Sequence, residues 1–208
     1  MIEEIVDILA PPKFEPTGQT LPRSQAIQTG KWIGTFNIWL YRSEGEPAML
    51  YQQRSLTKKW EPGKLDVSAG GHYAAGEKDL DGLREAEEEL GVKIPHQAIS
   101  FWGRKLNASL NADGDEERTV LSIYTAECNG ELTDLVLDPV EVTAVFWVPL
   151  RPLLEVHQGK LPVFTAQGMD AAGKVLTYDV SQSSFPFNID NYHQRMAEHI
   201  AVKLGITV

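Results

Sequence analysis

Four glutamates lie close together between Arg84 and Leu90, and their spacing could hold a divalent cation. A helix turns about 100° per residue, so Glu85, Glu88 and Glu89 would cluster on one side of it. The apolar residues of the same stretch fall nearly opposite, and they are Leu80, Leu83, Ala86 and Leu90. Glu87 projects near this apolar stripe and is not counted with the other three.

A solvated acidic face is the ordinary interpretation of such a run of charges. Here the charges destabilise the helix, because Glu85 and Glu89 stand at positions i and i+4, where like charges cost about 0.2–0.5 kcal/mol. They also lie toward the negative end of the helix dipole. Mg²⁺ requires hard oxygen ligands converging on one point, and a bound cation would turn the repulsion into attraction. Glu85, Glu88 and Glu89 are therefore predicted to bind Mg²⁺ or Mn²⁺.

The residues around this run resemble the signature of the Nudix family. That signature is Gly, five residues, Glu, seven residues, then Arg-Glu-apolar-any-Glu-Glu-any-Gly-apolar. Gly71 and Glu77 match its first half, and the run from Arg84 to Val92 matches its second half. Only six residues separate Glu77 from Arg84, one fewer than the signature, and the missing residue falls where the loop enters the helix. The resemblance implies a supporting ion pair between Glu77 and Arg84, which the shorter spacing leaves open.

The segment before the signature is similar to the Nudix branch that includes isopentenyl-diphosphate isomerase. In that branch the arginine and first lysine of an Arg-Ser-x-x-Lys segment contact the substrate diphosphate, which makes Arg54 and Lys58 candidates. Gly71 and His72 are further candidate substrate contacts, although a lone histidine in a glycine loop is more often structural. The isomerases also need a cysteine and a histidine at two positions where this chain has Gly70 and Ile33.

A carboxylate outside the signature often serves Nudix hydrolases as a metal ligand or a base. Glu117, just before an expected strand, is preferred to its neighbour Glu116, and Glu141 is a rival. Glu88 or Glu117 is the candidate base that removes a proton from water. The aromatic segment Phe185-Pro186-Phe187 and Tyr192 are expected to hold the rest of the substrate.

The resemblance implies an α+β fold, an α/β/α sandwich with a mixed central sheet, in a single domain over residues 1–208. An N-terminal extension is expected at 1–30, and a C-terminal helix packed on the domain at 185–208. Hydrophobic periodicity predicts strands near 35–41, 48–54, 98–106, 120–127, 142–148 and 175–178. It predicts helices near 24–29, 80–90, 150–157 and 189–204, with Asp79 or Asp81 as the N-cap of the second.

The composition of the chain argues against some classes of binding partner. The formal net charge of −10 argues against binding a nucleic-acid polymer, and no apolar run is long enough to span a membrane. The single cysteine, Cys128, excludes an intramolecular disulfide and a thiolate zinc site. A cytoplasmic protein is expected, acting on a small-molecule diphosphate, with a homodimer as the candidate assembly.

The expected activity is metal-dependent hydrolysis of a diphosphate linkage in a nucleoside diphosphate derivative or related molecule. Cations would neutralise the phosphate oxygens and lower the pKa of a bound water. One alternative is an isopentenyl-diphosphate isomerase-like enzyme, which Gly70 and Ile33 disfavour. The other is a non-catalytic domain that binds a nucleotide, which would be expected to have lost glutamates from the signature.

Overall fold

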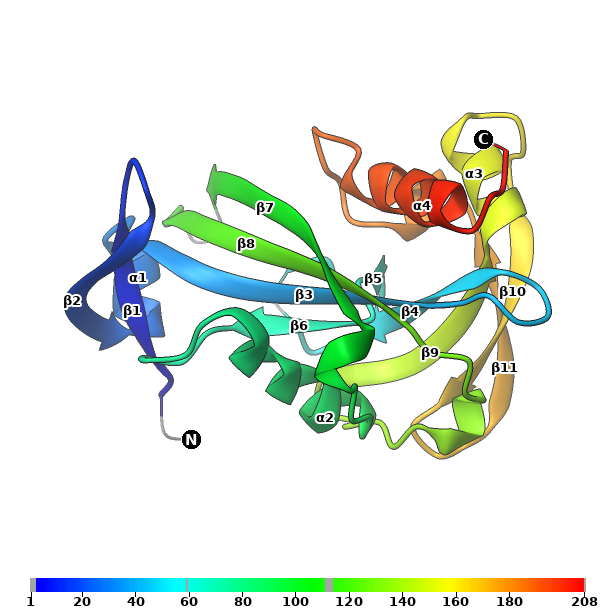
Figure 1. Ribbon diagram of the computed structural model, residues 1–208, viewed down its shortest axis with the longest axis horizontal. Coiled ribbons are helices and arrows are strands. Elements are labelled where there is room, and N and C mark those ends of the chain that lie inside the picture. Colours follow the sequence, from blue (N-terminus) through cyan, green and yellow to red (C-terminus); the bar gives the residue numbers. More distant parts are fainter. Residues whose placement is uncertain (1–2, 59, 111–113, 208) are drawn as a thin grey trace.

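The computed structural model describes residues 3–58, 60–110 and 114–207. They form an 11-stranded sheet with helices on both of its faces (Figure 1). The strands are β1 (Ile5–Ala10), β2 (Glu15–Pro22), β3 (Trp32–Arg42), β4 (Ala48–Arg54), β5 (Leu65–Asp66), β6 (Ala69–His72), β7 (Ile99–Leu110), β8 (Glu116–Glu127), β9 (Val142–Pro149), β10 (Phe164–Asp170) and β11 (Val175–Val180). The helices are α1 (Arg23–Gln28), α2 (Arg84–Leu90), α3 (Leu150–His157) and α4 (Tyr192–Lys203), with short 3₁₀ helices η1 (Asp79–Leu83), η2 (His96–Ala98), η3 (Leu132–Asp134) and η4 (Gln182–Ser184).

Strand β3 organises the sheet. It pairs in parallel with β8 along ten registered positions, from Trp32 opposite Arg118 to Tyr41 opposite Glu127. Its antiparallel neighbours include β4 and β6, and β4 continues through β9 and β10 to β11. The sheet is therefore mixed, as expected. Among the described residues, no helix combines the length and apolar character needed to cross a membrane.

Side chains of β3 alternate between two cores, one on each face of the sheet. Phe36, Ile38 and Leu40 pack toward α2, in a cluster that includes Ala86 and Leu90. The intervening Trp39 and Tyr41 pack on the other face, where α3 and α4 contribute to a second cluster. This alternation follows from the two-residue period of a strand. It confirms the predicted sandwich, with α2 on one side and α3 and α4 on the other (Figure 1).

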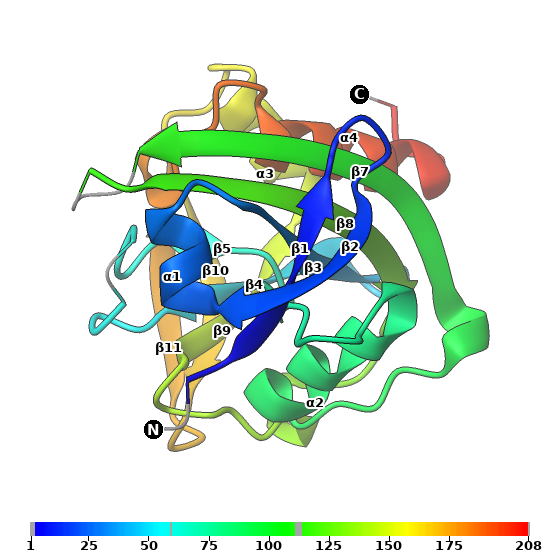
Figure 2. The same ribbon diagram turned by 90° about the vertical axis from the view of Figure 1, so that its left-hand side faces the viewer.

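The N-terminal segment folds against this sheet. The predicted short helix is present as α1, but the β1–β2 hairpin before it was not predicted. The β1–β2 hairpin and α1 lie at one end of the sheet (Figure 2). Strand β1 joins the sheet where Leu9 pairs with Trp32 of β3. Strand β1 also holds the loop before η1, because Ala75 N donates to Ile5 O at 2.8 Å and Gly76 N donates to the Asp7 carboxylate at 2.7 Å.

The predicted glutamate helix begins as a 3₁₀ helix, η1, and continues as α2 to Gly91, which is left-handed with φ 67°. Neither Asp79 nor Asp81 is the N-cap as predicted. Lys78 has that position, and the Asp81 carboxylate accepts its backbone N–H at 3.0 Å. A 3₁₀ helix rises about 2.0 Å per residue and an α-helix about 1.5 Å, so five 3₁₀ residues span about as far as six or seven α-helical ones. The tighter turn accommodates the shortened signature.

Candidate active site

Two of the predicted glutamates face strand β6: Glu89 is buried, and Glu85 is half-buried. The Glu89 carboxylate accepts hydrogen bonds from Gly70 N at 3.1 Å and from Gln52 Nε2 at 3.3 Å. At the next residue along β6, Gly71, a Cβ atom would overlap the Glu85 carboxylate. The missing side chain at Gly71 therefore lets the helix carboxylates approach the strand closely.

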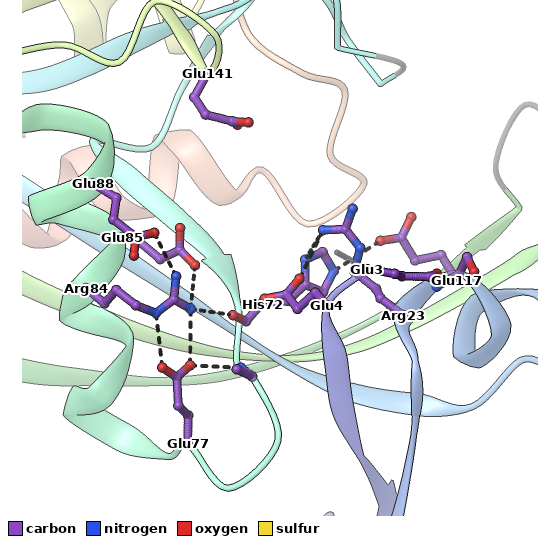
Figure 3. A network of polar contacts seen from close by, with 12 residues as sticks. Glu3, Glu4, Arg23, His72, Glu77, Arg84, Glu85, Glu88, Glu117 and Glu141 are labelled. Carbon is purple, nitrogen blue, oxygen red and sulfur yellow. Dashed lines mark hydrogen bonds and ion pairs between the residues drawn. The ribbon is translucent and has the colours of Figure 1, made fainter. Parts of the chain in front are cut away.

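Arg84 holds the carboxylates around it in a fixed array (Figure 3). Its Nε lies 3.0 Å from Glu77 Oε1, its Nη1 lies 2.8 Å from Glu88 Oε2, and its Nη2 lies 3.1 Å from Glu85 Oε1. Nη2 also donates to the backbone carbonyl of His72 at 3.3 Å. The ion pair between Glu77 and Arg84 is thus made in spite of the six-residue spacing. Arg84 links the helix to the glycine-rich strand.

Removal from water raises the pKa values of Glu85 and Glu89. It is the largest cause that raises the pKa of Glu85 to about 7; Glu88 and Glu4 raise it further, while Arg84 opposes the shift. Burial also raises the pKa of Glu89 to about 8, with Glu85 contributing and the Gly70 N–H opposing. A cation bound between such oxygens would favour their charged forms. Carboxylates supply the hard oxygen ligands that Mg²⁺ and Mn²⁺ prefer, so the side chains present fit either cation.

The three predicted metal ligands are not equivalent. The Glu88 side chain is 54% exposed, whereas that of Glu85 is 12% exposed. Within 3–58, 60–110 and 114–207, no three His, Cys, Asp or Glu side chains are arranged as a group that could hold a metal ion. The Arg84 guanidinium instead contacts Glu85 and Glu88. Binding of a cation by all three glutamates therefore requires their side chains to rearrange around Arg84.

The two predicted diphosphate contacts both carry carboxylate partners. Arg54 Nη1 lies 3.1 Å from the Asp66 carboxylate, and the guanidinium stacks on Trp60. Lys58 pairs with Glu141, the rival carboxylate outside the signature. Burial lowers the pKa of Lys58, and Arg54 lowers it further, while Glu89 and Glu85 oppose this shift. The charge of Lys58 therefore interacts electrostatically with Arg54 and with the glutamates of α2.

His72 and Glu117 lie together at a second cluster, which also includes two residues of the N-terminal segment (Figure 3). His72 Nε2 is 4.0 Å from Glu117 Oε1. Arg23 Nη1 is 3.3 Å from His72 Nδ1 and 3.3 Å from the Glu4 carboxylate. No local pattern marks Arg23 or Glu4, because their partners lie 19 to 49 residues away in the sequence.

The aromatic residues expected to hold substrate are mostly in the core. Phe185 and Tyr192 are buried, and Tyr192 Oη accepts a hydrogen bond from Trp39 Nε1 at 2.8 Å. The expectation is wrong for these two, because both belong to the core cluster that α3 and α4 form with the sheet. Phe187 alone of the three is exposed. A groove of about 650 Å³ lies elsewhere, beside η1, and none of the α2 glutamates lines it; its walls are Asp79, Leu80, Ile99, Phe101, Arg104 and Tyr124.

Comparison with known proteins is consistent with this geometry. The sequence pattern of the NUDIX domain matches residues 31–167. An uncharacterized Nudix hydrolase of Clostridium acetobutylicum is 29% identical over 148 residues, which are 70% of this chain and 71% of that protein. Nudix hydrolase 3 of Arabidopsis thaliana is 33% identical over 153 residues, 72% of this chain but only 20% of the much longer plant protein.

An isopentenyl-diphosphate Delta-isomerase of Citrobacter koseri is also similar, at 30% identity over 121 residues, 58% of this chain and 64% of the isomerase. Among solved structures, one from Deinococcus radiodurans superposes with a TM-score of 0.54 at 25% identity, covering 75% of this chain and 90% of the other. The region matched by the NUDIX pattern includes the glycine-rich strand and the glutamate helix, and it begins after Arg23.

Proposed function

The chain belongs to the Nudix hydrolase family, and from that premise we propose that it uses Mg²⁺ or Mn²⁺ to hydrolyse a diphosphate linkage in a nucleoside diphosphate derivative or a related small molecule. The observation that carries the proposal is the close packing of the buried Glu89 and the half-buried Glu85 against Gly70 and Gly71, which have no side chains. Two neighbouring carboxylates withdrawn from water are unfavourable when charged and alone, and a divalent cation compensates both.

Glu85, Glu88 and Glu89 would hold the cation, which when bound supplies Lewis acidity and lowers the pKa of a water molecule. The residues of the chain do the rest. Arg84 keeps Glu85 and Glu88 in place through its contacts with both. We assign proton removal to Glu117 in preference to Glu88, because Glu88 is one of the proposed cation ligands and its carboxylate is ion-paired with Arg84.

Lys58 is the stronger candidate for binding the substrate diphosphate. Its partner Glu141 lies on a loop, and both side chains are about one-third exposed, so an anionic substrate can exchange with Glu141. Arg54 is paired with the more buried Asp66, and its side chain stacks on Trp60. Lys58→Met is expected to raise KM about tenfold and leave the melting temperature nearly unchanged, whereas Arg54→Met should lower the melting temperature as well.

The test is a panel of nucleoside diphosphates and triphosphates, dinucleoside polyphosphates, nucleotide sugars and prenyl diphosphates, with Mg²⁺ or Mn²⁺. Released phosphate or nucleotide is monitored, and Glu89→Gln is the inactive control. The isomer of isopentenyl diphosphate is looked for in parallel. Isomerisation needs a proton donor on one face of the double bond, and Gly70 has no side chain to provide it. Isomer formed at a catalytic rate, without hydrolysis of any panel member, would contradict the proposal.

A further inference from the structure

The N-terminal segment delivers a positively charged residue to the catalytic region. The β1–β2 register places Ile5 opposite Pro22, so the residues just outside this pair, Glu4 and Arg23, become neighbours. Arg23 N donates to Glu4 O at 2.9 Å, and the Arg23 side chain pairs with the Glu4 carboxylate at 3.3 Å. Both residues precede the region matched by the NUDIX pattern. The hairpin therefore fixes Arg23 at both its backbone and its side chain.

Arg23 determines which nitrogen of His72 carries the proton. A guanidinium only donates hydrogen bonds, so its contact at 3.3 Å makes His72 Nδ1 the acceptor. Burial is the largest cause that lowers the pKa of His72 to about 3, and Arg23 and Lys58 add to it. The ring is therefore neutral at physiological pH, with its single proton on Nε2.

The protonated nitrogen faces the candidate base. His72 Nε2 is buried and has no hydrogen-bond partner among the residues that the structure describes. The nearby carboxylate oxygen is Glu117 Oε1, at 4.0 Å. A hydrogen bond of this type closes at about 3 Å, so a shift of about 1 Å in the Glu117 side chain completes it. An unpaired buried donor is costly, which favours that movement.

We propose that Arg23 is a positioning residue of the active site. By holding Nδ1 of His72 it directs Nε2–H toward Glu117, and this orients the carboxylate that accepts the proton of water. The catalytic part of the inference rests on the proposed function, in which Glu117 is the base. The tautomer of His72 follows from the contacts alone.

The tautomer is measured on the full chain without metal or substrate, by two-bond proton–nitrogen correlation spectra of ¹⁵N-labelled histidine. His72→Gln assigns the signals. The parent should show a protonated Nε2 and an acceptor Nδ1, and Arg23→Met should give a mixture of tautomers. Arg23→Lys keeps a charged donor and should restore the parent pattern. Arg42→Met, at the far end of β3, removes an arginine that stacks on Trp147 and should change nothing.

Kinetics of the most active panel substrate tests the catalytic part. A positioned base contributes about 10²–10⁴ in rate, so losing its orientation should lower kcat about tenfold while KM changes less than twofold. Adding Arg23→Met to Glu117→Gln should then have little further effect, since the two residues act through one group. Arg23→Lys should recover most of the lost kcat.

Two results would overturn the proposal. One is a His72 protonated on Nδ1, or a tautomer ratio that Arg23→Met leaves unchanged. The other is a rise in KM with unchanged kcat, which would make Arg23 a substrate contact. If the parent hydrolyses no diphosphate, the proposed function fails, and the spectra still decide whether Arg23 sets the tautomer.

Discussion

The two faces of the sheet bury ionisable groups of opposite kinds. On the α2 face the groups are Glu85 and Glu89, and on the α3 and α4 face they are His157 and His193. Burial disfavours the charged form in both cases, so it raises the pKa of the acids and lowers the pKa of the imidazoles.

The neighbours of these groups differ, and this difference separates a ligand site from a structural core. Glu85 and Glu89 have polar and charged neighbours, among them Arg84 and Lys58. His193 lies among the rings of Trp39, Tyr51 and Phe185, with Asp66 3.8 Å from its Nε2. The carboxylates can therefore exchange protons for a cation, whereas the imidazoles stay neutral and fill the core.

The largest expected effect is on activity. Glu89→Gln keeps the shape of the side chain and the hydrogen bond from Gly70 N but removes a charged ligand. Hydrolysis should fall by about 10²–10³ in kcat. The melting temperature of the metal-free protein should not fall, because the variant removes a buried carboxylate. Glu87→Gln on the same helix is the matched control, and equal activity of the two variants would place the site elsewhere.

The α2 face should make the metal-free protein less stable in alkali. Unfolded glutamates ionise near pH 4.5, whereas the pKa values of Glu85 and Glu89 are about 7 and 8 in the folded state. Between pH 4.5 and about 8 the folded state binds more protons than the unfolded chain, so the contribution is fully present below pH 4.5 and is lost as pH rises from there through 7 to 8. We expect the melting temperature to fall by about 5 °C from pH 6 to pH 9.

Saturating Mg²⁺ should abolish this fall in melting temperature at alkaline pH, because the cation replaces the protons that neutralise Glu85 and Glu89. The Glu85→Gln, Glu89→Gln double variant should lack the loss even without metal. An identical pH profile for the parent and the double variant would mean that the two carboxylates are solvated.

The α4 face should show the opposite, smaller response in acid. Burial lowers the pKa values of His157 and His193 to about 4, whereas an unfolded histidine titrates near 6.5. The unfolded chain binds more protons below pH 6.5, so stability falls as pH decreases from 6.5 toward 4. His193→Phe should flatten this part of the profile, measured by thermal unfolding, and His96→Gln, at an exposed position, should not. Mg²⁺ should leave the fall in stability between pH 6.5 and pH 4 unchanged.

Local patterns predicted the elements that carry strong periodicity. The strand at 48–54 and the helix at 150–157 have the boundaries expected from the sequence. Two of the missed strands lack such a pattern: β2 is polar and mostly exposed, with Pro16 and Gly18 inside it, and β10 contains Gly168, which packs against Phe146. Pairing with neighbours, which a local pattern does not encode, makes these segments strands.

In the candidate site too, local sequence patterns predict some features, and contacts between distant segments decide the others. The helix spacing predicts that Glu85, Glu88 and Glu89 project toward one side of α2, whereas their unequal burial depends on the contact of α2 with β6. Arg23 reaches His72 across 49 residues, and no local signal marks it. His193 shares a helix stripe with buried residues such as Met196 and Ile200, so its burial could have been inferred, but its stacking on Tyr51 could not.

The central claim is that the buried carboxylates of α2 form a divalent-cation site, and titration of the metal-free chain with Mn²⁺ tests it most directly. Calorimetry should show saturable binding by the parent that releases protons near pH 7.5, because Glu85 and Glu89 must ionise when the cation enters. The variant with glutamine at positions 85, 88 and 89 should bind at least about 100-fold more weakly and release no protons. Equal affinity of the two proteins for Mn²⁺ would contradict the account and leave α2 as an acidic helix without a metal.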